Sequence, residues 1–458
     1  MSDFRTEKDS LGEVEVPADA LWGAQTQRAV DNFPVSGRPM PRPFIEAVVR
    51  VKRAAANANH KLHLLGREER DAIVHACDQL LEGEHADQFP VDVYQTGSGT
   101  STNMNVNEVI ARLASREVEG INPNDHVNMS QSSNDVIPTA IHVSAVMAIQ
   151  TRLLPALTHL QGVIYEREAE FNETVKTGRT HLMDAMPVTV GQELQTWREQ
   201  LVTTVHRLDQ ACNDLLLVPQ GGTAVGTGVN AHEKFAEKFA AALSEHSGFK
   251  FKPLPHPFTG QSAVDAPVHF SGQLRGLAVV LMKISNDLRW MNSGPIHGLS
   301  EISLPALQPG SSIMPAKVNP VIPESSAMVC AQVMGLDSAV AMAGQSGNFQ
   351  LNVMLPLVGA NLMEMTSLLA NASRMLADKA IRGFTVNDRH LAEAVDRNPV
   401  LVTALNPEIG YARAAEIAKE AYASGRPIID VADERTDLTR EQLEGILSPI
   451  KLTRGGLG

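Results

Sequence analysis

The feature that most constrains the fold of this chain is a set of five apolar series in which spacings of three and four residues alternate. This spacing aligns the apolar side chains along one stripe of an α-helix, as in the contact seam of a helical bundle. The series cover residues 146–163, 190–215, 274–291, 329–343 and 358–376. The third is the most regular: Leu274, Leu277, Leu281, Ile284, Leu288 and Met291. We therefore expect an all-α fold built around five long helices, each about 40 Å long.

The composition agrees with a helical core. Hydrophobic residues make up 43% of the chain but aromatic residues only 4%, whereas sheet-rich cores depend on aromatic and β-branched side chains. In the third series, Val279, Val280 and Met282 are apolar positions outside the seam. A helix that is apolar on most sides must be covered on most sides, and one layer of five helices cannot do this. We expect the bundle to associate with further copies of the chain.

Three regions of the chain differ in character. Residues 1–131 mix short helical patterns with loops rich in proline and glycine, which predicts an N-terminal, mostly helical domain. Residues 132–388 contain the five apolar series and form the predicted central long-helix domain. Residues 389–458 have the pattern of a small C-terminal helical domain.

Charge and cysteine content exclude several classes of function. The net charge of −13 argues against nucleic acids and anionic membranes as partners. Cys77, Cys212 and Cys330 are widely spaced and form no metal or redox pattern, so we expect buried thiols in a reducing compartment. The first residues have no secretory or transit pattern, and no apolar run approaches about 18 residues. We expect a cytoplasmic protein without a membrane-spanning segment.

The stretch most informative about function runs from Gly310 to Asn319, Gly-Ser-Ser-Ile-Met-Pro-Ala-Lys-Val-Asn, and is followed by a further proline. Glycine and serine give a flexible loop rich in hydrogen-bond donors, and Pro315 fixes the backbone ahead of the Lys317 cation. Such a loop can surround a carboxylate with hydroxyls, backbone N–H groups and one ammonium. A connecting turn with a solvated lysine is the ordinary interpretation of an isolated Gly-Ser-Ser loop.

The whole run resembles the signature of the fumarase/aspartase superfamily, whose members eliminate a group from succinyl compounds to give fumarate. Other segments resemble the family's substrate segments in the expected order: 97–105, 122–125, 130–135, 178–184, 221–228 and 401–406. The resemblance runs from about Leu11 to the 440s. It implies a three-domain subunit, a homotetramer around a twenty-helix core, and active sites shared by three subunits.

The resemblance also implies roles for individual residues. Ser311 corresponds to the family's proton-abstracting base, which needs oriented N–H donors and a nearby cation to form an oxyanion. Lys317 would stabilise the doubly charged aci-carboxylate that forms when a proton leaves the carbon beside a carboxylate. His181 would handle the proton at the hydroxyl side, and Glu324 would orient it. The substrate ligands would be Ser98, Gly99, Thr100, Ser132, Ser133, Asn134, Thr180, Ser312, Lys317, Val318 and Asn319.

No pattern predicts a metal or an organic cofactor. His60 and His63 are three residues apart but lack a third ligand nearby in the sequence. The glycine-rich segment 221–228 lacks the Gly-Lys-Ser/Thr ending of a phosphate loop, and we expect it to provide a close backbone approach near the site. The expected ligand is a small dicarboxylate.

Differences within the superfamily favour one branch. Argininosuccinate and adenylosuccinate lyases resemble Lys-Lys-Asn or Lys-Arg-Asn where this chain has Val318 after the lysine. The segments 132–134 and 182–184 resemble class II, iron-independent fumarate hydratases, whereas Ala316 and Asn122 are closer to aspartases. The expected activity is reversible hydration of fumarate to L-malate, a tricarboxylic acid cycle reaction, by anti addition of water through an aci-carboxylate. Aspartate ammonia-lyase activity is the alternative, and a non-catalytic helical scaffold of the same fold is a remote one.

A secondary dicarboxylate site is expected to be weak or absent. In fumarate hydratases the segment that forms it usually begins His-Pro-Asn, whereas this chain has Asn122, Pro123, Asn124 and Asp125. A histidine can carry a positive charge, but an asparagine amide cannot. Asp125 would add repulsion toward an anion.

Overall fold

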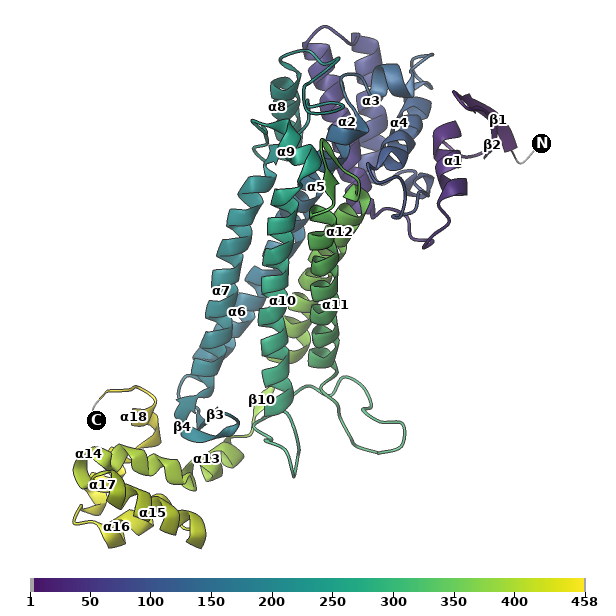
Figure 1. Ribbon diagram of the computed structural model, residues 1–458. Helices are drawn as coiled ribbons and strands as arrows, with labels where there is room; N and C mark the ends of the chain where they lie inside the picture. Colours follow the sequence, from purple (N-terminus) through teal and green to yellow (C-terminus); the bar gives the residue numbers. More distant parts are fainter. Residues whose placement is uncertain (1–3, 457–458) are drawn as a thin grey trace. The chain divides into compact units, whose positions relative to one another are not determined.

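Long helices dominate the computed structural model, which describes residues 4–456 (Figure 1). The first apolar series lies in α5 (Ser133–Ala148), one wider helical turn η3 (Ile149–Leu153) and α6 (Leu154–Glu170). The other four lie in α7 (Val190–Leu215), α10 (Asp265–Met291), α11 (Val321–Gly344) and α12 (Leu355–Leu376). The predicted all-α fold class and the five long helical segments are confirmed.

The predicted seams follow the buried stripes of these helices, except in α11, where Val329 and Leu336 are only partly buried. In α10 every residue of the regular series is at most 4% exposed. Thr204, the polar interruption in the seam of α7, is 5% exposed. Outside the seam, Val279 is 53% exposed. Burial of one stripe therefore holds each helix in place, while α10 keeps apolar surface that the chain itself does not cover.

The N-terminal region is helical and begins with a β-hairpin, β1 (Phe4–Asp9) and β2 (Gly12–Pro17). The helical elements that follow are α1 (Ala24–Asn32), α2 (Arg42–Lys61), α3 (Arg67–Glu82), η1 (Ala86–Gln88), α4 (Thr100–Ala114) and η2 (Pro123–Val127). Helix α2 is the centre of this region, since it packs against α3, α5 and α8 (Phe235–Ser247).

Short elements connect the long helices. They are β3 (Val175–Thr180), β4 (Met183–Thr189), β5 (Leu217–Val218), β6 (Lys252–Pro253), α9 (Pro257–Ser262), β7 (Ile302–Ser303), β8 (Gly347–Asn348), β9 (Leu351–Asn352), η4 (Ala377–Ile381) and β10 (Thr385–Val386). Every sheet among residues 4–456 has two strands. The hairpin of β3 and β4 has the longest paired strands among these elements and carries predicted site residues.

The C-terminal helices have an apolar core of their own, which includes Leu405, Val431 and Leu443. The elements are α13 (Asp388–Asp396), η5 (Pro399–Leu405), α14 (Asn406–Ile409), α15 (Tyr411–Ser424), α16 (Ile428–Arg435), α17 (Arg440–Ile446) and α18 (Pro449–Leu452).

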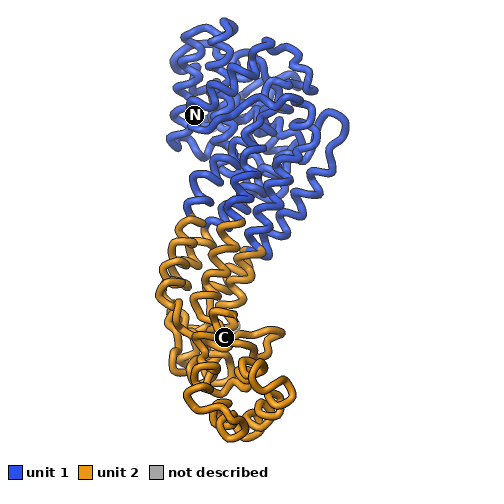
Figure 2. Tube along the Cα trace, turned by 90° about the vertical axis from the view of Figure 1, so that its left-hand side faces the viewer, with its two compact units in different colours: residues 1–155, 204–278, 330–370 blue, residues 156–203, 279–329, 371–458 orange. Residues whose placement is uncertain are grey.

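The described chain divides into two compact units (Figure 2). Unit 1 contains residues 1–155, 204–278 and 330–370, and unit 2 contains residues 156–203, 279–329 and 371–458. The boundaries fall inside α6, α7, α10, α11 and α12, so each of these helices contributes one part to each unit.

Two helical stretches are long and apolar enough, by length and composition alone, to cross a membrane. Residues 133–170 are 67% buried over the apolar window, and α11 is 28% buried. A buried core helix passes this test as well, so the result does not contradict the expectation of no membrane-spanning segment. In α11, Met328 is 69% exposed and Met342 is 63% exposed.

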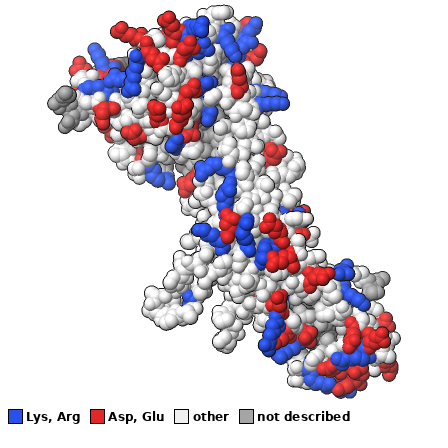
Figure 3. Space-filling model, turned by 180° about the vertical axis from the view of Figure 1, so that it is seen from behind, with Lys and Arg blue, Asp and Glu red and all other residues white. Residues whose placement is uncertain are grey.

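Charged side chains are unevenly distributed on the surface. On the face drawn in Figure 3 they are dense over the N-terminal region and over the C-terminal helices, and much of the surface of the long helices carries none. An uncharged helical surface with exposed methionine and valine is typical of a face that another protein surface covers.

Candidate active site

The predicted site residues lie in both units. Segments 98–100 and 132–134 belong to unit 1, whereas Thr180, His181 and segment 311–324 belong to unit 2.

His181 lies at the tip of the β3–β4 hairpin. Thr180 pairs with Met183, so His181 and Leu182 form a two-residue turn. Both have positive φ, 55° and 61°, which is the pattern of a type I′ turn that normally takes asparagine and glycine. The histidine is exposed, and Leu182 is 66% exposed. The fold therefore holds a histidine out from the subunit in a strained backbone conformation, which is common at functional sites.

Ser311 has the donors that a serine base requires. Its Oγ accepts hydrogen bonds from the backbone N–H groups of Ile313 (3.2 Å) and Met314 (3.0 Å). Two N–H groups directed at one hydroxyl oxygen stabilise negative charge on that oxygen. Lys317 is exposed and is the only charged residue between Leu304 and Pro320.

The loop around Ser311 is closed at its base. The Gly310 N–H donates to the Lys317 carbonyl at 2.9 Å, and the Asn319 side-chain amide donates back to the Gly310 carbonyl. A Cβ on Gly310 would lie 2.3 Å from the Lys317 carbonyl oxygen, so this closure requires glycine. Ser312 and Val318, two predicted ligands, are exposed on the same loop.

Glu324 lies in the first turn of α11, directly after the loop. No hydrogen bond or ion pair joins it to His181 among residues 4–456. The predicted pairing of these two residues is therefore not formed within one chain.

The predicted ligands of unit 1 come from two helix N-termini. Ser98 Oγ and Thr100 Oγ1 are 2.8 Å apart at the start of α4, where Gly99 has a φ of 73°. Ser132 caps α5 with a reciprocal capping box, and Ser133 Oγ accepts a hydrogen bond from the Asn103 amide of α4 at 3.2 Å. Helix N-termini and hydroxyls supply uncharged donors suited to a carboxylate.

The carboxylate of Asp135 joins these ligands to the glycine-rich segment. It is fully buried and accepts hydrogen bonds from the Ser132, Gly221 and Thr223 N–H groups, each at 2.9 Å. Burial raises its pKa, and these donors oppose the rise. Asn134 donates its side-chain amide to the Ala224 carbonyl at 2.8 Å. The segment 221–228 thus supports the predicted ligand segment 132–134 through its backbone.

A buried lysine contacts the residues that precede segment 132–134. Lys52 is 0% exposed, and its Nζ donates to Asn128 Oδ1 (2.9 Å) and to Gln131 Oε1 (3.0 Å). Burial lowers the pKa of Lys52 to about 7, and Asp135 opposes this shift. The patterns considered in the sequence gave no signal for this residue, because a lysine inside an alanine-rich helix is ordinarily exposed.

In the segment predicted as a doubtful secondary site, the Asn122 side chain forms hydrogen bonds within the segment itself. Asn122 caps η2, and its Oδ1 accepts hydrogen bonds from the N–H groups of Asn124 (2.8 Å) and Asp125 (3.0 Å). Its own N–H donates to His126 Nδ1 at 2.8 Å. The carbonyl end of the Asn122 side chain is therefore engaged within η2.

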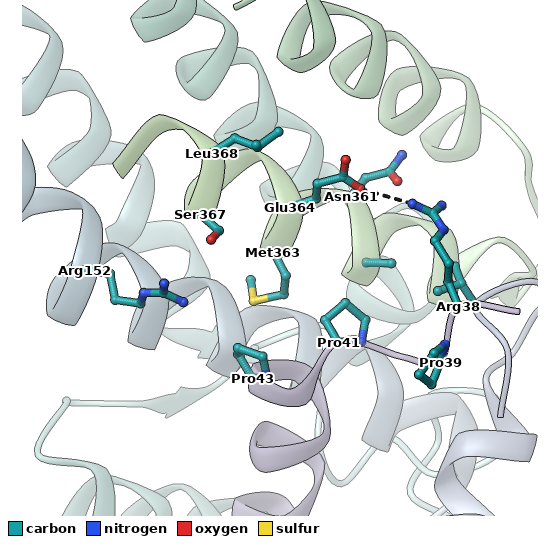
Figure 4. Close-up of a pocket in the computed structure, with 12 residues that line it drawn as sticks. Arg38, Pro39, Pro41, Pro43, Arg152, Asn361, Met363, Glu364, Ser367 and Leu368 are labelled. Carbon is teal, nitrogen blue, oxygen red and sulfur yellow. Dashed lines mark ion pairs between the residues drawn. The ribbon is translucent and has the colours of Figure 1, made fainter. Parts of the chain in front are cut away.

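Among the described residues, neither a group of metal ligands nor the pocket drawn in Figure 4 coincides with these residues. In the described part of the chain no three His, Cys, Asp or Glu side chains are grouped as metal ligands. A pocket of about 350 Å³ in unit 1 has Met363 at its floor and an ion pair between Arg38 and Glu364 (3.6 Å) at one end (Figure 4). None of the predicted site residues lines it.

The fold and these residues together define a lyase. Over residues 12–335 the chain matches the family described as Lyase, and over residues 401–454 it matches the family described as Fumarase C C-terminus. A serine with oriented N–H donors, a loop lysine and several hydroxyls and amides fit the elimination chemistry of such enzymes.

Similar proteins narrow the family. Fumarate hydratase class II 2 of Pseudomonas aeruginosa is 59% identical over 458 residues, 100% of both chains. Fumarate hydratase class II of Xylella fastidiosa is 54% identical over 455 residues, 99% of this chain and 96% of the relative. The crystal structure of class II fumarase from Schistosoma mansoni has a TM-score of 0.95 and 39% identity, covering 98% of this chain and 99% of that one. The chain belongs to the class II fumarate hydratase family.

Proposed function

We propose that the enzyme catalyses the reversible hydration of fumarate to L-malate. The observation that carries this proposal is the intact signature loop, in which Ser311 Oγ accepts two backbone N–H groups and Lys317 is the only charged side chain. Hydration of an activated double bond needs a base at one carbon, a proton donor at the other, and fixed donors at the carboxylate that gathers charge.

The proposed reaction, in the direction of malate dehydration, starts at the carbon beside a carboxylate. Ser311 removes a proton there, and its oxyanion is stabilised by the loop N–H groups. Lys317 and Asn319 stabilise the aci-carboxylate that results. His181, oriented by Glu324, then protonates the departing hydroxyl on the opposite face, which gives anti elimination of water.

An acidic protein can bind a dianion here because most of the proposed ligands are uncharged hydrogen-bond donors. Ser98, Thr100 and the segment 132–134 offer hydroxyls, an amide and helix N-termini, and Thr180 and Ser312 add further hydroxyls. Such donors compensate the two carboxylates without a cluster of fixed cations. No metal or organic cofactor takes part in the proposed reaction.

We infer that the enzyme is a homotetramer whose active sites combine residues of three subunits. Several observations support this. His181 is exposed at a hairpin tip, Glu324 does not contact it within one chain, and α10 and α11 present apolar side chains that the chain leaves exposed. In a tetramer with a twenty-helix core, those faces would become buried. The three-domain division at residues 131 and 388 belongs to the same proposal.

We also infer that the enzyme works in the cytoplasm. Cys77, Cys212 and Cys330 are buried thiols, which fits a compartment that keeps thiols reduced.

The decisive experiment supplies purified enzyme separately with L-malate and with L-aspartate and follows fumarate by its ultraviolet absorbance. Fumarate from malate alone is the expected result. Fumarate from aspartate but not from malate would replace the hydratase with an ammonia-lyase. The Lys317→Met variant serves as the site control, because it should reduce turnover at least a hundredfold while the protein remains folded.

A further inference from the structure

A buried carboxylate outside every predicted motif joins two cations of the β3 strand. Glu301 is 2% exposed, and its two oxygens have different partners. Oε1 accepts a hydrogen bond from Arg179 Nη1 at 2.5 Å, and Oε2 accepts one from Lys176 Nζ. Lys176 also contacts Glu193 Oε2 of α7 at 2.8 Å. Two cations and two anions thus balance one another along β3, from its second residue to the residue before its last.

Glu301 is itself fixed on both sides by its backbone. Its N–H donates to the Met291 carbonyl at the end of α10 (2.8 Å), and its carbonyl accepts the N–H of Asn387 beside β10 (2.9 Å). The carboxylate is therefore anchored to elements remote from the hairpin in sequence. Glu301 can therefore fix the position of the hairpin, because its own backbone is held by residues outside the hairpin.

A bulge in β3 brings the two cations to the same carboxylate. Residues three apart in a regular strand point to opposite faces. The register of β3 against β4 shifts between Thr177 and Arg179, at Gly178, and such a shift redirects the side chains that follow. A Cβ on Gly178 would lie 2.5 Å from the Met186 carbonyl oxygen, so this backbone approach requires glycine.

The same strand ends at the strained turn of His181. A two-residue turn of histidine and leucine with positive φ persists only where its surroundings over-determine it. Stability alone does not require this network of charges, since apolar residues of the same volume at a buried site often stabilise a fold equally well or better. An ionic network anchored away from the hairpin instead fixes direction, because each hydrogen bond has its own geometry.

We propose that Glu301 is a positioning residue that holds, through Lys176 and Arg179, the turn from which His181 acts on the hydroxyl of the substrate. The inference rests on the proposed role of His181. Glu301 does not touch the substrate in this proposal, and its effect is on the placement of the imidazole.

The test compares Glu301→Gln with the wild-type enzyme in the malate assay, with thermal unfolding and oligomeric state measured alongside. The amide keeps the shape but loses one acceptor and turns an NH₂ group toward a cation. We expect kcat to fall at least tenfold and KM for malate to change less than threefold. This split is expected because imidazole placement matters in the transition state more than in binding.

Arg198→Gln is the matched control. It breaks the pair between Arg198 of α7 and Glu168 of α6 (2.7 Å) in the same unit, which is partly buried and does not include a residue of the hairpin. We expect this variant to keep kcat within twofold of wild type, even where its unfolding temperature drops as far as that of Glu301→Gln.

Three results would overturn the proposal: wild-type kcat in Glu301→Gln, a loss confined to KM, or an equal loss of kcat in Arg198→Gln. Should Glu301→Gln not assemble, Arg179→Met gives the same decision, since Arg179 is 21% exposed and its removal leaves Glu301 paired with Lys176. The proposed function is tested apart from this, because only inactivity of the wild-type enzyme toward malate contradicts it.

Discussion

At the residue scale, the most unusual group in unit 1 is the ammonium of Lys52. It has two amide oxygens as partners, and no carboxylate of residues 4–456 is in hydrogen-bond contact with it. The pKa falls from 10.5 in the unfolded chain to about 7 in the folded protein, because burial penalises the charged form. Between these two values the unfolded chain binds more protons than the folded one. Stability due to Lys52 therefore rises with pH across this window and is lost as pH falls through about 7.

This linkage predicts a pH-dependent difference between the wild-type protein and Lys52→Met. Methionine fills a similar volume and does not titrate. The free energy of unfolding of the wild type, minus that of the variant, should therefore rise between pH 7 and 9.5, by up to about 1.4 kcal/mol per pH unit. Below pH 6 the difference should be constant. Thermal or denaturant unfolding at four pH values and fixed protein concentration measures it, and a difference independent of pH would refute the assigned titration.

Asn122 supplies a second prediction at this scale. Its Oδ1 is engaged in capping η2 and its amide carries no charge, so it should hold a dicarboxylate poorly. Crystals soaked in malate should show ligand beside Lys317 and Asn319 and none at Asn122. We expect Asn122→Ala to keep turnover within twofold of wild type at a cap-loss cost of about 1 kcal/mol in stability. Strong density at Asn122, or a large loss of turnover, would establish a working second site.

At the scale of elements, the long helices could be predicted and the hairpin could not. Leu274 and its successors repeat a spacing that only a helix buries on one side, so a local pattern was sufficient. The β3–β4 hairpin has a turn of His181 and Leu182, which lacks the Asn-Gly signal of a two-residue turn. Its stabilising partner, Glu301, is 125 residues from Lys176. Such pairing follows from the tertiary fold and leaves no trace in local sequence.

The candidate site divides in the same way. The motif residues, such as Ser311 and Lys317, were found through a family signature. The supporting roles of Asp135, Lys52 and Glu301 could not be predicted, even though Asp135 lies in the motif segment 130–135, because these residues act through partners distant in sequence. A buried charge is visible only once the fold shows its burial.

Gly97 gives a prediction about how the α4 ligand segment is seated. Its carbonyl accepts the Leu355 N–H at 3.0 Å, and an added Cβ would lie 1.8 Å from the Val353 carbonyl oxygen. Gly97→Ala must therefore displace the loop that carries Ser98 from the start of α12. We expect kcat/KM for malate to fall at least tenfold and the unfolding temperature to drop, because backbone cannot yield as a flexible side chain can.

Gly162→Ala is the control for this substitution. Gly162 lies inside α6, and an added Cβ would meet no described atom within 4 Å apart from its own stretch of helix backbone. Alanine should therefore stabilise the helix by up to about 1 kcal/mol and leave kcat/KM within twofold of wild type. Equal losses in the two variants would mean that the contact at Val353 does not seat the loop.

At the scale of the whole molecule, several apolar side chains of the long helices and one predicted catalytic residue are exposed on the single chain. Met328 and Met342 of α11 are 69% and 63% exposed, and Val279 of α10 is 53% exposed. Each leaves apolar area in water at a cost of about 25 cal/mol per Å². The exposed His181 belongs to the same pattern, since a proton-handling group needs a surrounding site. Both observations favour an assembly in which further copies cover the helices and complete the site.

Subunit sharing predicts that two inactive variants can restore each other. His181→Ala and Lys317→Met each remove a group required at every site, so each homotetramer should be inactive. After dissociation and reassembly of an equal mixture, a site that takes these two residues from different subunits is free of both lesions in about one case in four. Activity should therefore recover to about a quarter of wild type, whereas either variant reassembled alone should recover none. If tetramers re-form from the mixture, as verified by light scattering, and stay inactive, both residues must come from one subunit, and the proposed sharing would be wrong.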